Sequence, residues 1–389
     1  MTVGTTTIPF GRPMIGDEER EAVAEVLAGT VLSHGPRGHQ FEQAFAEFTG
    51  AEHAIATASC AAALHLAYLG LGLEPGDEVI VPAQTHVATA HVVVACGATP
   101  VFVDCDATGN IDLDAAEAAV TTRTRAISPV HYLGRPVDME RVLTLARKHD
   151  LFVVEDCALA LGATFDEVHV GLHGDVGCFS FYPVKHITTG EGGMAISRRP
   201  DVAERISKQR AFGIDKTVVA ERRNSSAYDV ELFGLNYRMG ELAAALGVEQ
   251  LKKAPEFIAR RKSNYEAICF GLADFPLLEL ADTGSYARGM STHYCITAVL
   301  VERLAPRRAD LIDLLKERGL GVSIHYPRPV PLTSYYRDQR GFRPGQFPVA
   351  ERISNDSISI PVGPHLADGD AERIVSIVRD AVTELDDGE

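Results

Sequence analysis

Hydrophobic and polar positions follow a repeating strand–helix pattern along the first half of the chain. Short apolar runs alternate with longer stretches that carry apolar residues every three or four positions. The expected strands are 53–57, 78–81, 100–104, 125–131 and 151–156. The expected helices between them are 61–71, 87–95, 113–120 and 139–149. Strands separated by helices at this spacing predict an α/β fold with a parallel sheet and helical crossovers.

The pattern differs at both ends of the chain. Helices are expected at 17–27 and 39–48 with a loop at 33–37, and the repeat lapses after residue 197. A long helix is expected at 242–262, followed by strands at 292–301 and 321–325 and helices at 311–318 and 370–382. We therefore expect a large α/β domain with an N-terminal arm at 1–245 and a smaller α+β domain at 246–389.

Composition restricts the class of protein. The chain has 389 residues, 46% apolar and 23% charged, as in ordinary globular enzymes. Its net charge of −16 argues against binding to nucleic acid or to an anionic membrane surface. The sequence shows neither an apolar run long enough to span a membrane nor a secretory signal. Seven scattered cysteines without CxxC spacing are typical of reduced thiols in a cytoplasmic protein.

The first candidate for chemistry is Lys185, in the segment GDVGCFSFYPVKHITTGEGG (174–193). A short apolar strand at 178–182 leads through a proline to this lysine and then to a glycine-rich turn. Burial lowers the pKa of a lysine, so an amine placed here can form a Schiff base with an aldehyde cofactor. An isolated lysine at a strand edge is more often structural.

A second segment favours the chemical interpretation. LFVVED (151–156) is a continuous apolar run that ends in two carboxylates, as expected for a central parallel strand. Ligands bind at the carboxyl ends of such strands. Pyridoxal phosphate needs a lysine for its aldehyde and an acid for its ring nitrogen. Lys185 and Asp156, on neighbouring strand ends, suit these two tasks, whereas no HExxH, CxxC or carboxylate triad indicates a metal.

Twelve ordered blocks of sequence resemble the DegT/DnrJ/EryC1/StrS group of sugar aminotransferases, which are pyridoxal-phosphate enzymes of the aspartate-aminotransferase fold (fold type I). The blocks are 8–13, PGDEVIVP (75–82), VATA (87–90), GATPVFVD (97–104), PVHYLG (129–134), ED (155–156), FSFYPVK (179–185), TTGEGG (188–193), NYRM (236–239), GVEQL (247–251), HYP (325–327) and FPVAERIS (347–354). They cover nearly the whole chain, unlike a lone motif.

The resemblance implies roles for four residues. Lys185 matches the lysine that binds the cofactor aldehyde, and Asp156 matches the acid at the pyridine nitrogen. Ser180 matches a hydroxyl that holds the cofactor phosphate. Asn236 matches an asparagine that reaches the phosphate from the neighbouring subunit, which implies a homodimer with shared active sites.

The chain departs from the family pattern at three cofactor-binding positions. Cys60 and Ala61 stand where Gly-Thr is usual, at the expected start of a helix, where backbone N–H groups still suit a phosphate. His86 replaces an aromatic ring that stacks on the cofactor, and it could stack or make a local hydrogen bond. Leu159 replaces a glutamine near the phenolic oxygen of the cofactor, and it could face the ring or pack in the core.

Three further residues are candidates for contact with the substrate, and two others are expected to be structural. His325 and Tyr326 precede a proline-rich loop and are candidates for substrate contact. Arg238 adjoins Asn236 and could meet an anionic substrate or pair with Glu241. His131 and Glu155 are expected to be structural.

The resemblance implies an aminotransferase that takes its amino group from glutamate or glutamine. The implied acceptor is a keto-sugar, most often a nucleotide-linked keto-deoxysugar of surface polysaccharide or natural-product biosynthesis. A related enzyme acting on a cyclitol or another non-sugar ring, and a catalytically altered regulatory homologue, remain alternatives. A dehydratase branch with histidine in place of the lysine is disfavoured by Lys185.

Overall fold

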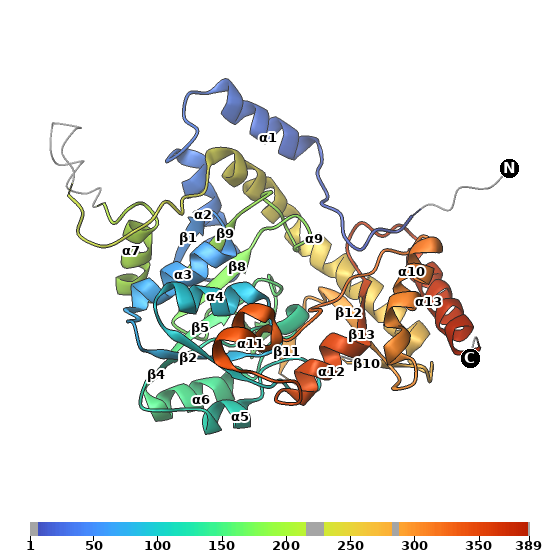
Figure 1. The fold of residues 1–389 in the computed structure, drawn as a ribbon. Helices are drawn as coiled ribbons and strands as arrows, with labels where there is room; N and C mark the ends of the chain where they lie inside the picture. The colour runs from blue at the N-terminus through green and yellow to red at the C-terminus, as the bar shows by residue number, and fades with distance from the viewer. Residues whose placement is uncertain (1–6, 215–228, 282–287, 388–389) are drawn as a thin grey trace.

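The computed structural model describes residues 7–214, 229–281 and 288–387 (Figure 1). Within these residues, seven strands form one sheet in the order β1-β9-β8-β5-β4-β2-β3. The strands are β1 (His53–Thr57), β2 (Glu78–Pro82), β3 (Thr99–Val103), β4 (Thr124–Ile127), β5 (Phe152–Asp156), β8 (Val176–Ser180) and β9 (Gly193–Ser197). Strands β8, β5, β4, β2 and β3 run parallel, and β9 is antiparallel to both β1 and β8. The expected α/β class with a mostly parallel sheet is confirmed.

Helices cover both faces of this sheet, as the continuous apolar strands require. They are α1 (Asp17–Ala28), α2 (Pro36–Thr49), α3 (Cys60–Leu71), α4 (Val87–Ala95), α5 (Leu113–Ala118), α6 (Met139–His149) and α7 (Pro200–Gln209). Side chains alternate between the faces of a strand. Val79 and Val81 of β2 accordingly pack with Leu64 of α3, whereas Ile80 packs with Val142 of α6.

A second apolar core lies at the C-terminal end of the chain. Helix α9 (Glu241–Leu272) leads to it, and it surrounds a small antiparallel sheet of β10 (Leu278–Leu280), β12 (Cys295–Leu300) and β13 (Ser357–Pro361). The helices α10 (Arg308–Glu317) and α13 (Asp370–Asp387) complete it. The N-terminal segment runs from α1 to this core (Figure 1), where Ile8 is buried. The expected domain boundary at residue 245 falls inside α9 and stays a prediction.

The remaining elements are short. They are β6 (Thr164–Phe165), β7 (Val168–His169), β11 (Gly289–Met290), α11 (Ser334–Arg340), α12 (Pro348–Asp356) and the 3₁₀ turns Tyr132–Gly134, Ala305–Arg307 and Val330–Leu332. Among the helices of the described residues, none is both long and apolar enough to cross a membrane.

Several local expectations are corrected. The expected loop 33–37 ends early, because α2 begins at Pro36, and the fixed φ of proline suits a first helical position. The expected strand 321–325 is irregular and pairs through isolated bridges, including Ser323 to Ser359. Helix α9 continues ten residues beyond the expected end at residue 262. Strand β9 and helices α7 and α12 were not anticipated: β9 directly follows the glycine-rich turn, and both helices lie beyond residue 197, where the strand–helix repeat lapses.

Candidate active site

A cavity of about 290 Å³ lies where β5 and β8 end and where α3 and α4 begin. Its described lining comprises Ser59, Cys60, Ala61, Leu64, Thr85, His86, Ala88, Val130, Asp156, Ala158, Leu159, Ser180, Tyr182, Lys185, Glu191 and Tyr326. The carboxyl ends of parallel strands and the N-termini of helices meet at this edge of the sheet, where α/β proteins bind ligands. The structure therefore brings Lys185 and Asp156 into one cavity, although 29 positions of sequence separate them.

Lys185 follows β8 in a tight turn, in which its N–H donates to the carbonyl of Tyr182 over 2.9 Å. Its amine lies 5.3 Å from the centre of the Tyr294 ring. Burial lowers the pKa of Lys185 to about 8, a shift that the charge of Arg261 increases and that of Asp156 opposes. An appreciable fraction of Lys185 is therefore the free amine near neutral pH.

Asp156 ends β5, and its backbone pairs with Cys178 of β8. The side chain is nearly buried, at 4% exposed. Its Oδ2 accepts a hydrogen bond from the Thr89 hydroxyl at 2.8 Å, and its Oδ1 accepts from the N–H of Ala158 at 3.1 Å. The Thr85 hydroxyl lies 2.8 Å from that of Thr89. Because Thr89 has one proton and gives it to Asp156, Thr85 must donate to Thr89, and the chain of hydroxyls ends at the carboxylate.

The N-terminus of α3 forms another wall of the cavity. Ser59 caps this helix by accepting from the N–H of Ala62 at 3.1 Å, and Cys60 and Ala61 follow at its first positions. Ser180 lies across the cavity at the end of β8. Gly193 of β9 passes the start of α3 so closely that a Cβ there would come within 2.4 Å of the Ser59 carbonyl carbon. Backbone N–H groups and hydroxyls thus converge on one end of the cavity, as an anion requires.

His86 and Leu159 each line the cavity and also make a local structural contact, so both interpretations of their roles stay open. His86 caps α4 by accepting from the N–H of Ala88 at 3.2 Å. Its ring also lines the cavity and packs edge-to-face with the Tyr326 ring, with ring centres 5.8 Å apart. Burial and the charge of Lys185 lower the pKa of His86, so its ring is neutral at pH 7. Leu159 faces the cavity and also packs with Tyr132 and Tyr294 in a small apolar cluster.

Three predicted site residues lie outside this described lining. Asn236 is exposed on an extended segment. The guanidinium of Arg238 lies 5.2 Å from the ring centre of Phe212, while Glu241 accepts from the backbone N–H groups of residues 37 and 38. His325 stacks on Phe10 with ring centres 5.4 Å apart, and its Nδ1 lies 3.0 Å from the Ser359 hydroxyl.

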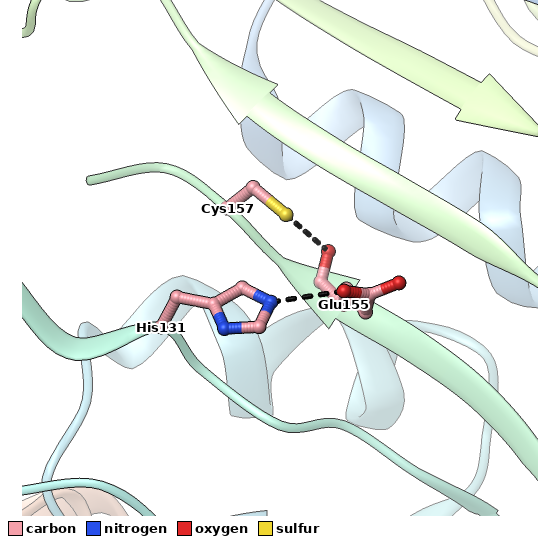
Figure 2. A group of neighbouring side chains, drawn as sticks. All are labelled: His131, Glu155 and Cys157. Atoms are coloured by element: carbon pink, nitrogen blue, oxygen red, sulfur yellow. Dashed lines mark hydrogen bonds and ion pairs between the residues drawn. The ribbon is translucent and has the colours of Figure 1, made fainter. Parts of the chain in front are cut away.

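A buried group of His131, Glu155 and Cys157 has the composition of a metal site (Figure 2). Its donor atoms are already used. His131 Nδ1 accepts from the N–H of Val137 at 3.1 Å, so Nε2 carries the proton and donates to Glu155 at 3.0 Å. Glu155 also accepts from the backbone N–H groups of residues 171, 173 and 174. These bonds make the group a support for the loop after β7, in keeping with the structural roles expected for His131 and Glu155.

Sequence reasoning missed several lining residues and one supporting residue. Thr89 lies within the VATA block, and Thr85 precedes it by four positions, a spacing that places both on one face of a helix start. Glu191 belongs to the TTGEGG block, and Ser59 stands at a recognisable N-cap position. Hydroxyl and carboxyl groups inside the family-like blocks were the signal that could have found them.

Comparisons with known proteins agree on one family. A sequence model of the DegT/DnrJ/EryC1/StrS aminotransferase family matches residues 13–379. The spore coat polysaccharide biosynthesis protein SpsC of Bacillus subtilis is 37% identical over 386 residues, which cover 97% of this chain and 98% of SpsC.

Solved structures give the same result. Helicobacter pylori PseC, an aminotransferase involved in the biosynthesis of pseudoaminic acid, superposes with a TM-score of 0.91 at 28% identity, covering 97% of this chain and 100% of PseC. The PLP-form of the putative sugar aminotransferase Spr1654 from Streptococcus pneumoniae superposes with a TM-score of 0.90 at 27% identity, covering 97% of this chain and 99% of Spr1654.

Proposed function

Because the chain belongs to the DegT/DnrJ/EryC1/StrS aminotransferase family, we propose that it moves an amino group from glutamate or glutamine to a keto-sugar. The proposed acceptor is a nucleotide-linked keto-deoxysugar of surface polysaccharide or natural-product biosynthesis. One observation carries the proposal: a single cavity holds Lys185, Asp156, Ser180 and the N-terminus of α3. The names of SpsC and PseC, both from sugar or polysaccharide biosynthesis, support the choice of acceptor.

The residues of the cavity fit pyridoxal phosphate, the cofactor of this family. Lys185 would hold the aldehyde and Asp156 the ring nitrogen, while Ser180 and the N-terminus of α3 would hold the phosphate. At this helix start Ala61 lacks the hydroxyl of the threonine that is usual in the family, and Cys60 replaces a glycine. Burial raises the pKa of the Cys60 thiol well above the usual range, so the thiol stays neutral beside a phosphate. When bound, the cofactor carries the amino group and withdraws electrons from the reacting carbon.

The chain supplies proton transfer, orientation and exclusion of water. An amine with a pKa of about 8 exists in both protonation states near neutral pH, so Lys185 can accept and return a proton within the cavity. Asp156, held by Thr89 and Ala158, offers its carboxylate as a fixed acceptor. Leu159, Val130 and the ring of Tyr326 form an apolar wall that limits water around the reacting groups.

Absorbance spectroscopy tests this function directly. The purified protein, incubated with pyridoxal phosphate and freed of excess, is expected to show a near-ultraviolet or visible band that glutamate or glutamine diminishes. A panel of keto acceptors that includes nucleotide keto-sugars and a keto-cyclitol should then restore the band with the true acceptor. Recovery of the absorbance band with the keto-cyclitol alone would contradict the sugar assignment. A band that neither glutamate nor glutamine diminishes would favour a regulatory homologue.

Thr89 is expected to position Asp156. Thr89→Val keeps the shape of the side chain but removes the hydrogen bond to the carboxylate. A hydrogen bond to a charged group is worth about 1.5–3 kcal/mol, so the Kd for pyridoxal phosphate should rise about 10-fold or more. The Kd is measured by absorbance titration, with Thr85→Val as the control that leaves the bond to Asp156 in place. In an Asp156→Asn background the effect of Thr89→Val should shrink, and an undiminished effect would contradict coupling through the carboxylate.

We further propose a homodimer in which Asn236 and Arg238 complete the cavity of the partner subunit. In the described structure, Asn236 is exposed and does not line the cavity of its own chain. Three large aromatic side chains are exposed: Tyr182 beside the cavity, and Phe212 and Phe233 near Asn236. Their exposure favours a dimer in which a second copy of the chain buries them. The free thiols of all seven cysteines support a cytoplasmic location.

Complementation tests the shared site. Lys185→Ala and Asn236→Ala homodimers are each expected to be impaired. Heterodimers isolated with two affinity tags contain one cavity free of both substitutions, so each should recover about half of the wild-type activity. Heterodimers that form but show only about half of the activity of Asn236→Ala homodimers would show that each chain uses its own Asn236.

A further inference from the structure

A second, smaller cavity adjoins Lys185. Its volume is about 20 Å³, and it is enclosed by the N-terminal arm, the turn after β8, helix α9 and the segment before α13. Lys185 lines both cavities. Arg12 and Arg261 also line the small one, whereas no Asp or Glu appears among its described lining residues. Three cationic side chains without a carboxylate are unexpected in a chain with a net charge of −16.

Arg261 is the unusual member of this lining. Its side chain is only 5% exposed, and its Nη1 donates to the carbonyl of Tyr294 at 2.9 Å. Its Nε–H has no hydrogen-bond partner among the described residues. Burial lowers the pKa of Arg261 to about 10, and among the described residues no carboxylate forms an ion pair with it. A buried guanidinium is costly unless an anion or enough acceptors surround it.

The guanidinium of Arg261 lies 5.7 Å from the centre of the Tyr294 ring, and the other neutral groups around the cavity add no negative charge. Burial, with a contribution from Arg261, lowers the pKa of both His186 and His365, so both rings are neutral at pH 7. Gln250 donates to the Met14 carbonyl and to Glu19 behind the cavity wall. Glu19 in turn pairs with Lys253 at 2.8 Å, so its charge is already balanced.

We propose that this cavity binds one small monovalent anion of halide size, with Arg261 at its base and Arg12 at its mouth. The volume admits about one water-sized occupant, so it excludes an amino acid or a sugar phosphate. An anion there would offset the charge of Arg261 and so favour the protonated amine of Lys185. The anion concentration of the medium would thus influence the protonation of Lys185.

The direct test uses the cofactor-loaded enzyme, so that phosphate already occupies the N-terminus of α3. Chloride is titrated against sodium gluconate at constant ionic strength, and the ³⁵Cl NMR line width and Tm are followed. We expect a saturable excess line width and a Tm increase of roughly 1–3 °C in chloride. Arg260→Met is the matched control, because Arg260 is the adjacent arginine of α9, also donates to a backbone carbonyl, and lies outside the cavity. It should respond like the wild type.

Arg261→Met should lose both responses. Since removing a buried arginine can also disturb folding, Arg12→Met provides an independent variant at an exposed position, and it should weaken chloride binding several-fold. Equal responses in the wild type, Arg261→Met and Arg12→Met, or the absence of a saturable response in the wild type, would overturn the proposal and assign the cavity to water. Binding is measured without turnover, so failure of this site and failure of the proposed transamination are distinguishable.

Discussion

Lys185→Ala is expected to lower kcat/KM for transamination by about 10³-fold or more, because the substitution removes both the cofactor-binding amine and the proton carrier. The expectation rests on position: Lys185 follows β8 by a tight turn and lies in the cavity that also holds Asp156. Borohydride reduction of the cofactor-loaded enzyme, followed by peptide mapping, should place the label on Lys185.

The same residue sets a pH dependence. Because burial lowers the pKa of Lys185 to about 8, the rate of cofactor loading should rise with pH through the region around 8 and then level. An unburied lysine would show this rise more than two pH units higher. Lys262→Ala, at an exposed lysine of α9, is the control and should leave labelling and rate unchanged. A label on another lysine, or a loading profile that rises only above pH 10, would contradict the assignment.

Asp156→Asn is expected to cost about 10²–10⁴-fold in kcat, because an amide has the shape of the carboxylate but cannot hold a proton on the ring nitrogen. The amide oxygen can keep the bond from the N–H of Ala158, and the amide NH₂ can donate to the Thr89 hydroxyl, which then donates to Thr85. The free energy of unfolding should therefore change little. Steady-state kinetics and denaturant unfolding measure the two quantities separately.

Glu155→Gln is the matched control, since it alters the adjacent carboxylate in the same way. Glu155 accepts hydrogen bonds from His131 and from three backbone N–H groups, and a glutamine amide would turn a donor toward some of them. The expected loss is about 2–4 kcal/mol in the free energy of unfolding. Should Glu155→Gln instead lose catalysis with full stability, or Asp156→Asn keep its activity, the roles assigned to the two carboxylates would be reversed.

The candidate site was largely accessible from sequence where its residues belong to local patterns. Asp156 ends a continuous apolar run, and Lys185 follows a short strand and precedes a glycine-rich turn. Both patterns are properties of neighbouring residues, because strand periodicity and turn chemistry are local. The pairing of β5 with β8 then follows from the parallel strand–helix alternation, and it brings the two residues to one edge.

Contacts between distant segments could not be obtained in this way. Thr89 supports Asp156 across 67 positions of sequence. His325 was expected near the substrate, but in the described structure it stacks on Phe10 from the N-terminal arm, while the next residue, Tyr326, lines the cavity. Arg261 meets Tyr294 and the turn of Lys185 through the packing of α9 on both cores.

The sequence by itself therefore determined the α/β class and the family resemblance, and it predicted the amine and the acid that we assign to the cofactor. These depend on side-chain period, turn residues and local order, which neighbouring positions encode. Only the tertiary structure decided which hydroxyl holds Asp156 and which of His325 and Tyr326 faces the cavity. It also showed that Arg261 is buried with no carboxylate paired to it among the described residues. Those features depend on the approach of segments far apart in the chain, whose geometry is set by packing of the whole fold.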